Sequence, residues 1–152
     1  MNWDAVGAVA EIAGSLAVVV TLAYLLIQMK LSHKSAKGAS TNQTRAALTD
    51  VLSAVSENSE TVMVYARGLA DSSNLESHER VRFDLIIYQM MRVLETCFLE
   101  YHEGLVSEEL WQAQWRGSKS VFTTRGGRQS WTRQKYFVSQ SFMTWVSEHL
   151  DD

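Results

Sequence analysis

Proline is absent from this sequence of 152 residues, and only one cysteine, Cys97, is present. Without proline, long helices can form with no forced break. A single cysteine excludes an intrachain disulfide and a cysteine-based zinc cluster, and it is typical of a reducing compartment. The formal net charge of -3 gives no overall signature of nucleic-acid binding.

Charge is also missing from the run between Ile12 and Met29, which is rich in Leu, Val, Ala and Ile. As a helix, this run would rise roughly 27 Å, close to the thickness of the hydrocarbon core of a bilayer. We therefore predict one transmembrane helix within residues 1–30. A secretory signal peptide would have a basic start, whereas this start carries Asp4 and Glu11. A buried core helix would be unusually long and apolar for so small a domain, and an amphipathic surface helix needs a strongly charged face.

Lysine and arginine do not occur before the predicted span, whereas the sequence after it is basic. Lys30, Lys34 and Lys37 follow the span, and the next acidic residue is Asp50. The positive-inside rule then places the short N-terminus outside the cell and the bulk of the chain in the cytoplasm. The three lysines are expected to contact anionic lipid headgroups.

One face of the predicted span carries small and polar side chains at alternating spacings of three and four residues. This seam comprises Gly7, Ala10, Gly14, Ala17, Thr21, Tyr24 and Gln28. Bulky aliphatic side chains, including Leu16 and Ile27, cover the opposite face. Helices in a bilayer associate by close backbone approach, so we predict that the seam holds a homo-oligomer. Small residues are also common in spanning helices that stay single, and this alternative remains open.

Glu11 lies beside the seam, near the outer boundary of the apolar run. An ionisable group at this depth must reach water, a partner or a lumen. Two roles are therefore open for it. Glu11 either extends to the outer interface or, in several copies together with Gln28, lines a cation-conducting pore.

The rest of the sequence predicts helices and no strands. Residues 31–57 carry few large apolar side chains and predict either a juxtamembrane helix or a flexible linker. From there on, apolar residues recur with the helical period of 3.6. The expected fold is all-α: a single N-terminal transmembrane helix followed by a cytoplasmic helical domain over residues 58–152.

Capping residues divide this cytoplasmic domain into helices. Asn58 or Ser59 is expected to begin a short helix, and Ser107 and Ser139 are expected to begin two later ones. A turn is expected from Thr123 to Gly127.

The longest helix of the domain is predicted from Glu76 to Glu103 and is expected to form the centre of the bundle. One line of this helix runs from Val81 and Leu85 to Arg92 and Glu95, and the last two, three residues apart, are expected to pair. A wide apolar arc beside this line, which extends to Phe98, predicts burial on more than one side.

Four short segments carry a resemblance: Asn2–Ile12, Glu79–Phe83, Gly104–Trp111 and Gly126–Trp131. Together they resemble a family of small uncharacterised bacterial membrane proteins, over nearly the full length of the chain. The resemblance implies a span in the cell inner membrane and a cytoplasmic helical domain. It brings no catalytic residues with it.

Motifs for catalysis and cofactor binding are missing from the sequence. The dipeptides His78-Glu79 and His102-Glu103 lack the spacing of a zinc-binding helix, so ordinary exposed side chains explain them better. A phosphate-binding glycine loop and a Ser-His-Asp arrangement are also missing. We expect no enzyme activity, metal or cofactor.

The stretch from Trp111 to Val138 contains arginines, lysines and aromatic residues but no acidic residue. Such a stretch could bind nucleic acid or anionic lipid. Alternatively, its aromatics, Trp115, Trp131 and Tyr136, pack inward while its cations face the acidic residues between Glu95 and Glu109, in the same copy of the chain or in a neighbouring one. Adjacent blocks of opposite charge favour the second interpretation, so the expected partners are other copies of the chain and the bilayer.

Overall fold

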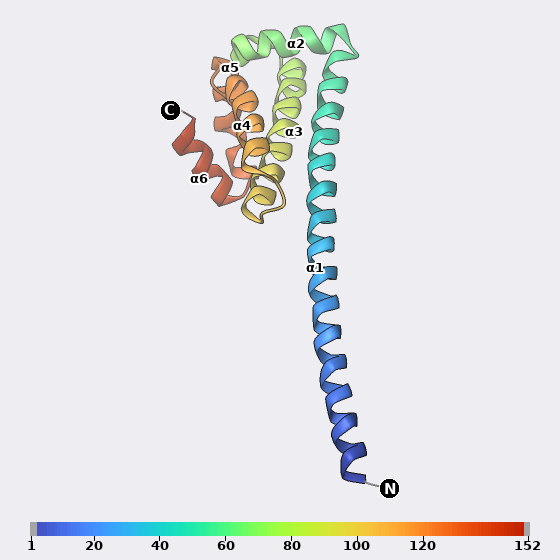
Figure 1. Ribbon diagram of the computed structural model, residues 1–152. Coiled ribbons are helices and arrows are strands. Elements are labelled where there is room, and N and C mark those ends of the chain that lie inside the picture. Colours follow the sequence, from blue (N-terminus) through green and yellow to red (C-terminus); the bar gives the residue numbers. More distant parts are fainter. Residues whose placement is uncertain (1–2, 151–152) are drawn as a thin grey trace. The chain divides into compact units, whose positions relative to one another are not determined.

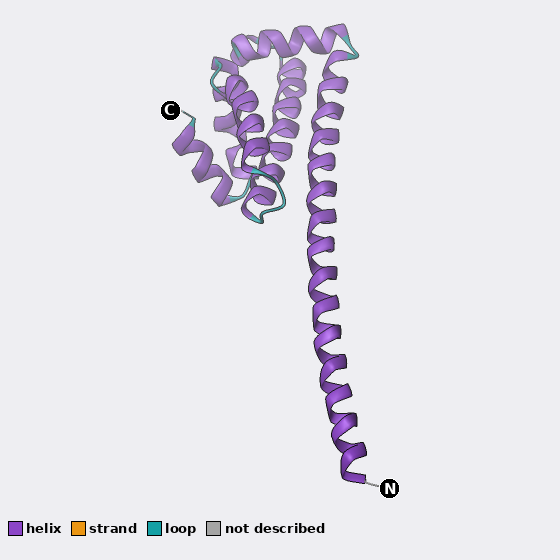
Figure 2. Cartoon of the chain, in the orientation of Figure 1, coloured by secondary structure: helices purple, strands orange, loops and turns teal. Residues whose placement is uncertain are grey.

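The computed structural model describes the backbone of residues 3–150. It also describes the exposure of Glu11, Gly14 and residues 16–150. These residues form helices joined by short turns, with no strand among them, which confirms the predicted all-α class (Figure 2). In chain order the elements are α1 (Trp3–Ser56), α2 (Ser59–Ala70), the 3-10 helix η1 (Ser72–Asn74), α3 (Ser77–His102), α4 (Glu108–Phe122), α5 (Arg125–Gln134), the 3-10 helix η2 (Lys135–Phe137) and α6 (Gln140–His149) (Figure 1).

The chain divides into two compact units, residues 1–38 and residues 39–152. Helix α1 runs through both units, and residues 31–56 are part of it. Of the two forms predicted for residues 31–57, a helix and a flexible linker, the structure shows the helix. Gly38 does not end the helix, because a glycine in a helix costs only about 1 kcal/mol relative to alanine.

Helix α3 is the centre of the second unit, as predicted. It packs against α2, α4, α5 and α6. Its inward-facing side chains are fully buried at Phe83, Ile87 and Met91. Aromatic rings join it to the neighbouring helices, because Phe98 of α3 lies 5.5 Å, centroid to centroid, from Trp111 of α4. Such ring pairs contribute about 0.5–1.5 kcal/mol each beyond their buried area.

The part of α1 that belongs to the second unit packs on this core through one face. Thr44 and Val51 are buried, and the Thr44 hydroxyl donates a hydrogen bond to Glu100 Oε2 at 3.0 Å. Cys97 of α3 is fully buried. Burial, helped by the negative charge of Glu100, raises the pKa of the Cys97 thiol to about 11. The thiol is therefore a neutral core side chain.

Two of the predicted helix caps are confirmed. Asn58 Oδ1 accepts a hydrogen bond from Glu60 N at 2.8 Å, and α2 begins at the next residue after Asn58. Ser107 Oγ accepts from Leu110 N at 3.3 Å at the start of α4. Caps of this kind stabilise a helix by about 1 kcal/mol.

Two details of the later helices differ from the prediction. The expected turn from Thr123 to Gly127 is shorter, because the Thr124 hydroxyl caps α5 and the helix already begins at Arg125. Ser139 does precede α6, but its side chain makes no capping hydrogen bond.

Helices α2 and α5 approach each other closely at two glycines. A Cβ atom added to Gly126 of α5 would lie 1.6 Å from the carbonyl oxygen of Gly68 in α2. A Cβ atom added to Gly68 would lie 2.3 Å from the ring of Phe83. Only a residue without a side chain fits at either position, so the Gly126-Gly127 sequence has a packing role.

One face of α3 is open to solvent, beside the sides that pack against the neighbouring helices. The exposed fraction is 61% at Val81 and 57% at Leu85. The adjacent helix η2 does not cover this face. Its own Tyr136 and Phe137 are 74% and 66% exposed, so the prediction that Tyr136 packs inward is wrong.

Candidate functional site

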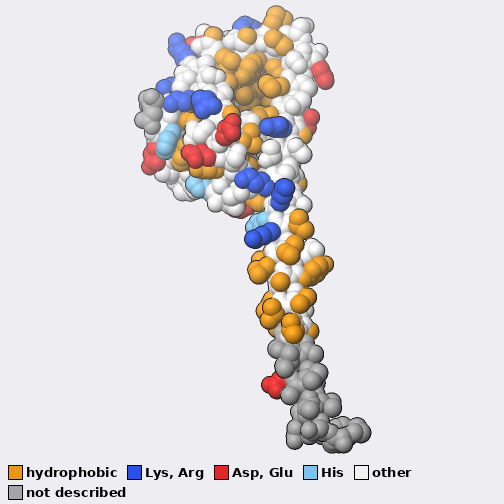
Figure 3. All heavy atoms as spheres, viewed as in Figure 1, with side chains coloured by type: hydrophobic (Ala, Val, Ile, Leu, Met, Phe, Trp, Pro, Cys, Tyr) orange, Lys and Arg blue, Asp and Glu red, His pale blue; other side chains and the backbone are white. Residues whose placement is uncertain are grey.

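The apolar segment of α1 in the first unit is uncovered along its described length. Its large apolar side chains over residues 16–31 are exposed by between 51% at Leu25 and 64% at Val20. Figure 3 shows these hydrophobic side chains gathered in a band, with lysine and histidine side chains following it. So much apolar surface in contact with water is unfavourable, at about 25 cal/mol for each Å².

One described helix region, Leu16–Ser56, contains a stretch that is long and apolar enough to cross a membrane. A signal sequence or the core helix of a soluble protein can have the same length and composition. A core helix is mostly buried, however, whereas no residue of this apolar stretch is buried in the described chain.

The predicted seam is exposed wherever its side chains are described. Ala17, Tyr24 and Gln28 are exposed, and a Cβ atom added to Gly14 would have nothing within 4 Å. Gly7 and Ala10 lie outside the residues whose side chains are described. The Thr21 hydroxyl donates to the carbonyl of Ala17 at 2.8 Å, so the helix itself satisfies this polar group.

The charged residues near the segment are exposed as well. Glu11 is exposed, and so are Lys30, Lys34 and Lys37 after the segment. A lumen could form only between copies of the helix, so both roles predicted for Glu11 remain predictions. The exposed lysines are free to reach toward headgroups, as long basic side chains do at the ends of spans.

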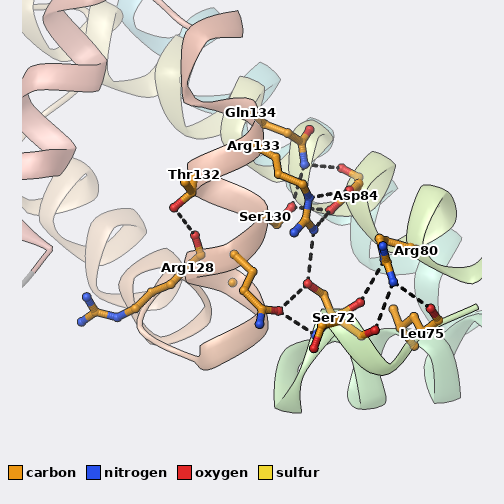
Figure 4. Close-up of polar contacts among 12 residues, drawn as sticks. Ser72, Leu75, Arg80, Asp84, Arg128, Ser130, Thr132, Arg133 and Gln134 are labelled. Carbon is orange, nitrogen blue, oxygen red and sulfur yellow. Dashed lines mark hydrogen bonds and ion pairs between the residues drawn. The ribbon is translucent and has the colours of Figure 1, made fainter. Parts of the chain in front are cut away.

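The second unit contains a polar network that joins η1, α3 and α5 (Figure 4). Asp84 Oδ1 accepts hydrogen bonds from Ser130 Oγ at 2.7 Å and from Arg133 Nη2 at 2.6 Å. Gln134 Nε2 donates to the Asp84 carbonyl at 3.0 Å. Ser72, which is fully buried, donates through its hydroxyl to an amide oxygen of α5 at 2.6 Å.

Asp71 closes the other side of this network. Hydrogen bonds from the Ser73 hydroxyl, the Gln129 amide and the Ser73 backbone N–H lower the pKa of Asp71 to about 2, and the positive charge of Arg125 adds to the effect. Arg80 completes the arrangement by donating to three backbone carbonyls of residues 72, 73 and 75 at 3.0–3.2 Å.

These polar groups form hydrogen bonds and ion pairs with one another. The network therefore holds the elements together, and it does not present free donors or acceptors to a ligand. Sequence reasoning missed it, although a signal was present. Gln129, Ser130, Arg133 and Gln134 recur on one face of α5, and two of them, Ser130 and Gln134, are buried polar residues. A polar helix face that is buried requires partners on another element.

The two His-Glu dipeptides occupy ordinary positions. Hydrogen bonds from the backbone N–H of Glu76 and from the Arg67 guanidinium lower the pKa of Glu79. The ring of His102 lies against that of Phe98, with 4.4 Å between their centroids. Within the part of the chain that the structure describes, no group of three or more His, Cys, Asp or Glu residues is placed to hold a metal ion.

The basic stretch after Trp111 follows the prediction only in part. Trp115 and Trp131 pack inward, as expected. Two of its arginines, however, pair with aspartates from earlier elements rather than with the block between Glu95 and Glu109 of the same chain. These ion pairs are Arg125 with Asp71 at 3.1 Å and Arg133 with Asp84 at 2.6 Å.

The acidic block has other partners. Glu95, which is buried, pairs with Arg92 of its own helix and accepts from Ser139 N at 2.6 Å. The interaction predicted between Arg92 and Glu95 is thereby confirmed.

An open cavity of about 680 Å³ lies between α3 and α6. Its apolar walls include Phe98 and Trp145, and His102 and Glu148 also line it. Cavities of this size accommodate small molecules or the side chains of a partner helix. Sequence reasoning did not identify it, because its two walls come from helices that are distant in the chain.

No family model, no curated protein sequence and no solved structure matches this chain.

Proposed function

We propose that the chain is a single-span membrane protein whose N-terminal helix assembles copies of it, so that it acts as a membrane-anchored assembly module. The observation that carries this proposal is the uncovered apolar segment over residues 16–31, at which large side chains expose half or more of their surface. A bilayer would remove this surface from water and so stabilise the helix by roughly 10 kcal/mol or more.

The seam supplies the contact between copies. Lipid chains are as apolar as leucine, so helices associate in a bilayer where small side chains let their backbones approach. Gly14 and Ala17 provide such positions on an exposed face. Because Thr21 already donates within its own helix, this face can enter lipid or meet a copy without an unsatisfied hydroxyl.

The flanking charges set the orientation in this proposal. Lys30, Lys34 and Lys37 are all exposed and lie on the C-terminal side of the segment. In an inner membrane they would keep that side cytoplasmic, together with the second unit. The polar network of the second unit joins its own helices. This arrangement agrees with a protein that acts by assembling rather than by catalysis.

The experiment that tests the seam compares one substitution on two faces of the same helix. Ala17→Leu enlarges the seam, whereas Ala23→Leu enlarges the opposite face, and both side chains are exposed. Native mass measurement of the detergent-solubilised full-length chain should show an oligomer for the unchanged protein and for Ala23→Leu. Ala17→Leu should shift the mass toward the monomer, because bulk at the seam prevents close approach.

An oligomer mass that Ala17→Leu leaves unchanged would contradict the seam. A monomer mass for the unchanged protein would contradict the assembly function itself.

A further inference from the structure

Four exposed apolar and aromatic side chains and the half-buried Tyr88 form a surface on the second unit, which we call the α3–η2 patch: Val81, Leu85, Tyr88, Tyr136 and Phe137. The rings of Tyr88 and Phe137 meet edge to face, with centroids 6.3 Å apart. Leu85, Tyr88 and Phe137 line one hollow of about 290 Å³. Side chains of α3 and η2 are therefore joined in one surface.

The composition of the patch is that of a protein contact. Tyr136 and Phe137 are consecutive and are 74% and 66% exposed. Aromatic residues are enriched at the centres of protein interfaces, where they contribute much of the binding energy. Their exposure in a 3-10 helix also contrasts with the burial of Trp111 and Trp131 in the same unit.

Most of the basic side chains near the patch are paired within the chain. Three arginines of α3 and α5 are paired with carboxylates: Arg82 with Glu60 at 3.0 Å, Arg92 with Glu95, and Arg133 with Asp84. Lys135 keeps its positive charge and lies over the ring of Tyr136, 5.3 Å from its centroid. Paired arginines attract anionic lipid or nucleic acid weakly, and the patch itself is apolar and aromatic, so the chemistry favours an apolar protein surface as the partner.

The size of the patch limits which kinds of partner can bind it. From the exposed fractions of its side chains, the patch presents roughly 500 Å² of apolar surface, a size typical of the largest patch on a monomer, and such patches are often functional. Stable complexes between free proteins bury about 800 Å² on each partner. The patch alone is therefore too small to hold a partner from solution, but it suffices between chains that are already held together, because tethering raises their effective concentration to the millimolar range.

We propose that the α3–η2 patch contacts the second unit of another copy of this chain within the same oligomer. This inference rests on the proposed function, since the span supplies the tether. Assembly through α1 then brings the second units together, and the patch fixes how they pair. The apolar surface of one copy meets the apolar surface of the next.

The test places the photocrosslinking residue p-benzoylphenylalanine at Tyr136 in the full-length chain in its membrane. Illumination should yield covalent dimers of this chain. Crosslinks only to lipid, only to a different protein, or none at all would each overturn the proposal.

A matched pair of variants tests whether the patch causes the contact. With the crosslinker at position 136, Leu85→Glu should lower the dimer yield about tenfold. Leu99→Glu is the control: Leu99 is also an exposed leucine of α3, but it lies about 21 Å farther along the helix. An equal effect of the two variants, or no effect of either, would count against the patch. Phe137→Ser should repeat the result of Leu85→Glu, and buried-tryptophan fluorescence checks that each variant is folded.

The mass of the unchanged protein separates this inference from the proposed function. An oligomeric mass without crosslinks at position 136 overturns the patch and leaves the seam in place. A monomeric mass overturns the assembly function, and the patch contact that depends on it.

Discussion

At the scale of single residues, the second unit depends on carboxylates that tie short elements to long ones. Asp71 is the clearest example, because it accepts from Ser73 at 2.6 Å and from Gln129 at 3.0 Å and pairs with Arg125 of α5. These partners stabilise the ionised form, which is why the pKa of Asp71 lies at about 2. The negative charge thus links the end of α2 to the start of α5.

Asp71 should make the second unit sensitive to acid. Its pKa is lower in the folded chain than in the unfolded chain, where an aspartate titrates near 4. Its contribution is therefore complete above about pH 4 and is lost as the pH falls toward 2. Urea unfolding, followed by tryptophan fluorescence at several pH values, should show a smaller loss over this range for Asp71→Asn than for the unchanged chain. Asp50→Asn, at an exposed aspartate of α1, should keep the unchanged profile; identical profiles for all three chains would refute the role of Asp71.

At the scale of elements, the second unit is set by how closely its helices cross. The contact between Gly68 and Gly126 brings the backbones of α2 and α5 together, and a Cβ atom at Gly126 would lie 1.6 Å from a carbonyl oxygen. Backbone atoms cannot yield as the end of a flexible side chain can. The crossing therefore tolerates no side chain.

Gly126→Ala should lower the free energy of unfolding by about 2 kcal/mol or more, since overpacking against a backbone cannot relax locally. Gly117→Ala is the matched control, because a Cβ atom at that helical position has nothing within 4 Å. That substitution should raise stability by about 0.5–1 kcal/mol through helix propensity. Equal effects of the two substitutions in urea unfolding would contradict the close crossing.

The elements were largely predictable from the sequence, because periodicity and caps are local signals. The helix predicted from Glu76 to Glu103 is observed as Ser77–His102, and Asn58 and Ser107 act as caps. Burial was less predictable. Periodicity identifies the apolar residues of α3, but how far they are covered depends on where the neighbouring helices end, so periodicity alone does not predict the exposure of Val81 and Leu85.

Ion pairs between distant elements could not be predicted from the sequence for a related reason. Adjacent blocks of opposite charge suggested local pairing between Glu95–Glu109 and the basic stretch. The fold instead brings Arg133 to Asp84, 49 residues away, because η1, α3 and α5 meet there. The candidate span differs from both cases: length and composition define it, so the sequence was sufficient to locate the exposed apolar segment of α1.

At the scale of the whole molecule, the account joins an apolar helix in the first unit to a packed helical second unit. The large apolar side chains described in the first unit, over residues 16–31, are all exposed, whereas the second unit has a buried apolar core. A bilayer around the first unit would account for this difference. The lysines after the segment would then place the second unit in the cytoplasm.

The most direct test of the span is the accessibility of its two ends to a membrane-impermeant maleimide in intact cells. Asn2→Cys and Ser35→Cys are made separately, and the unchanged chain is the control because Cys97 is fully buried. The account predicts that Asn2→Cys is labelled in intact cells and that Ser35→Cys is labelled only after the membrane is permeabilised. Recovery of the chain in the soluble fraction, or labelling of both variants from the same side, would contradict it.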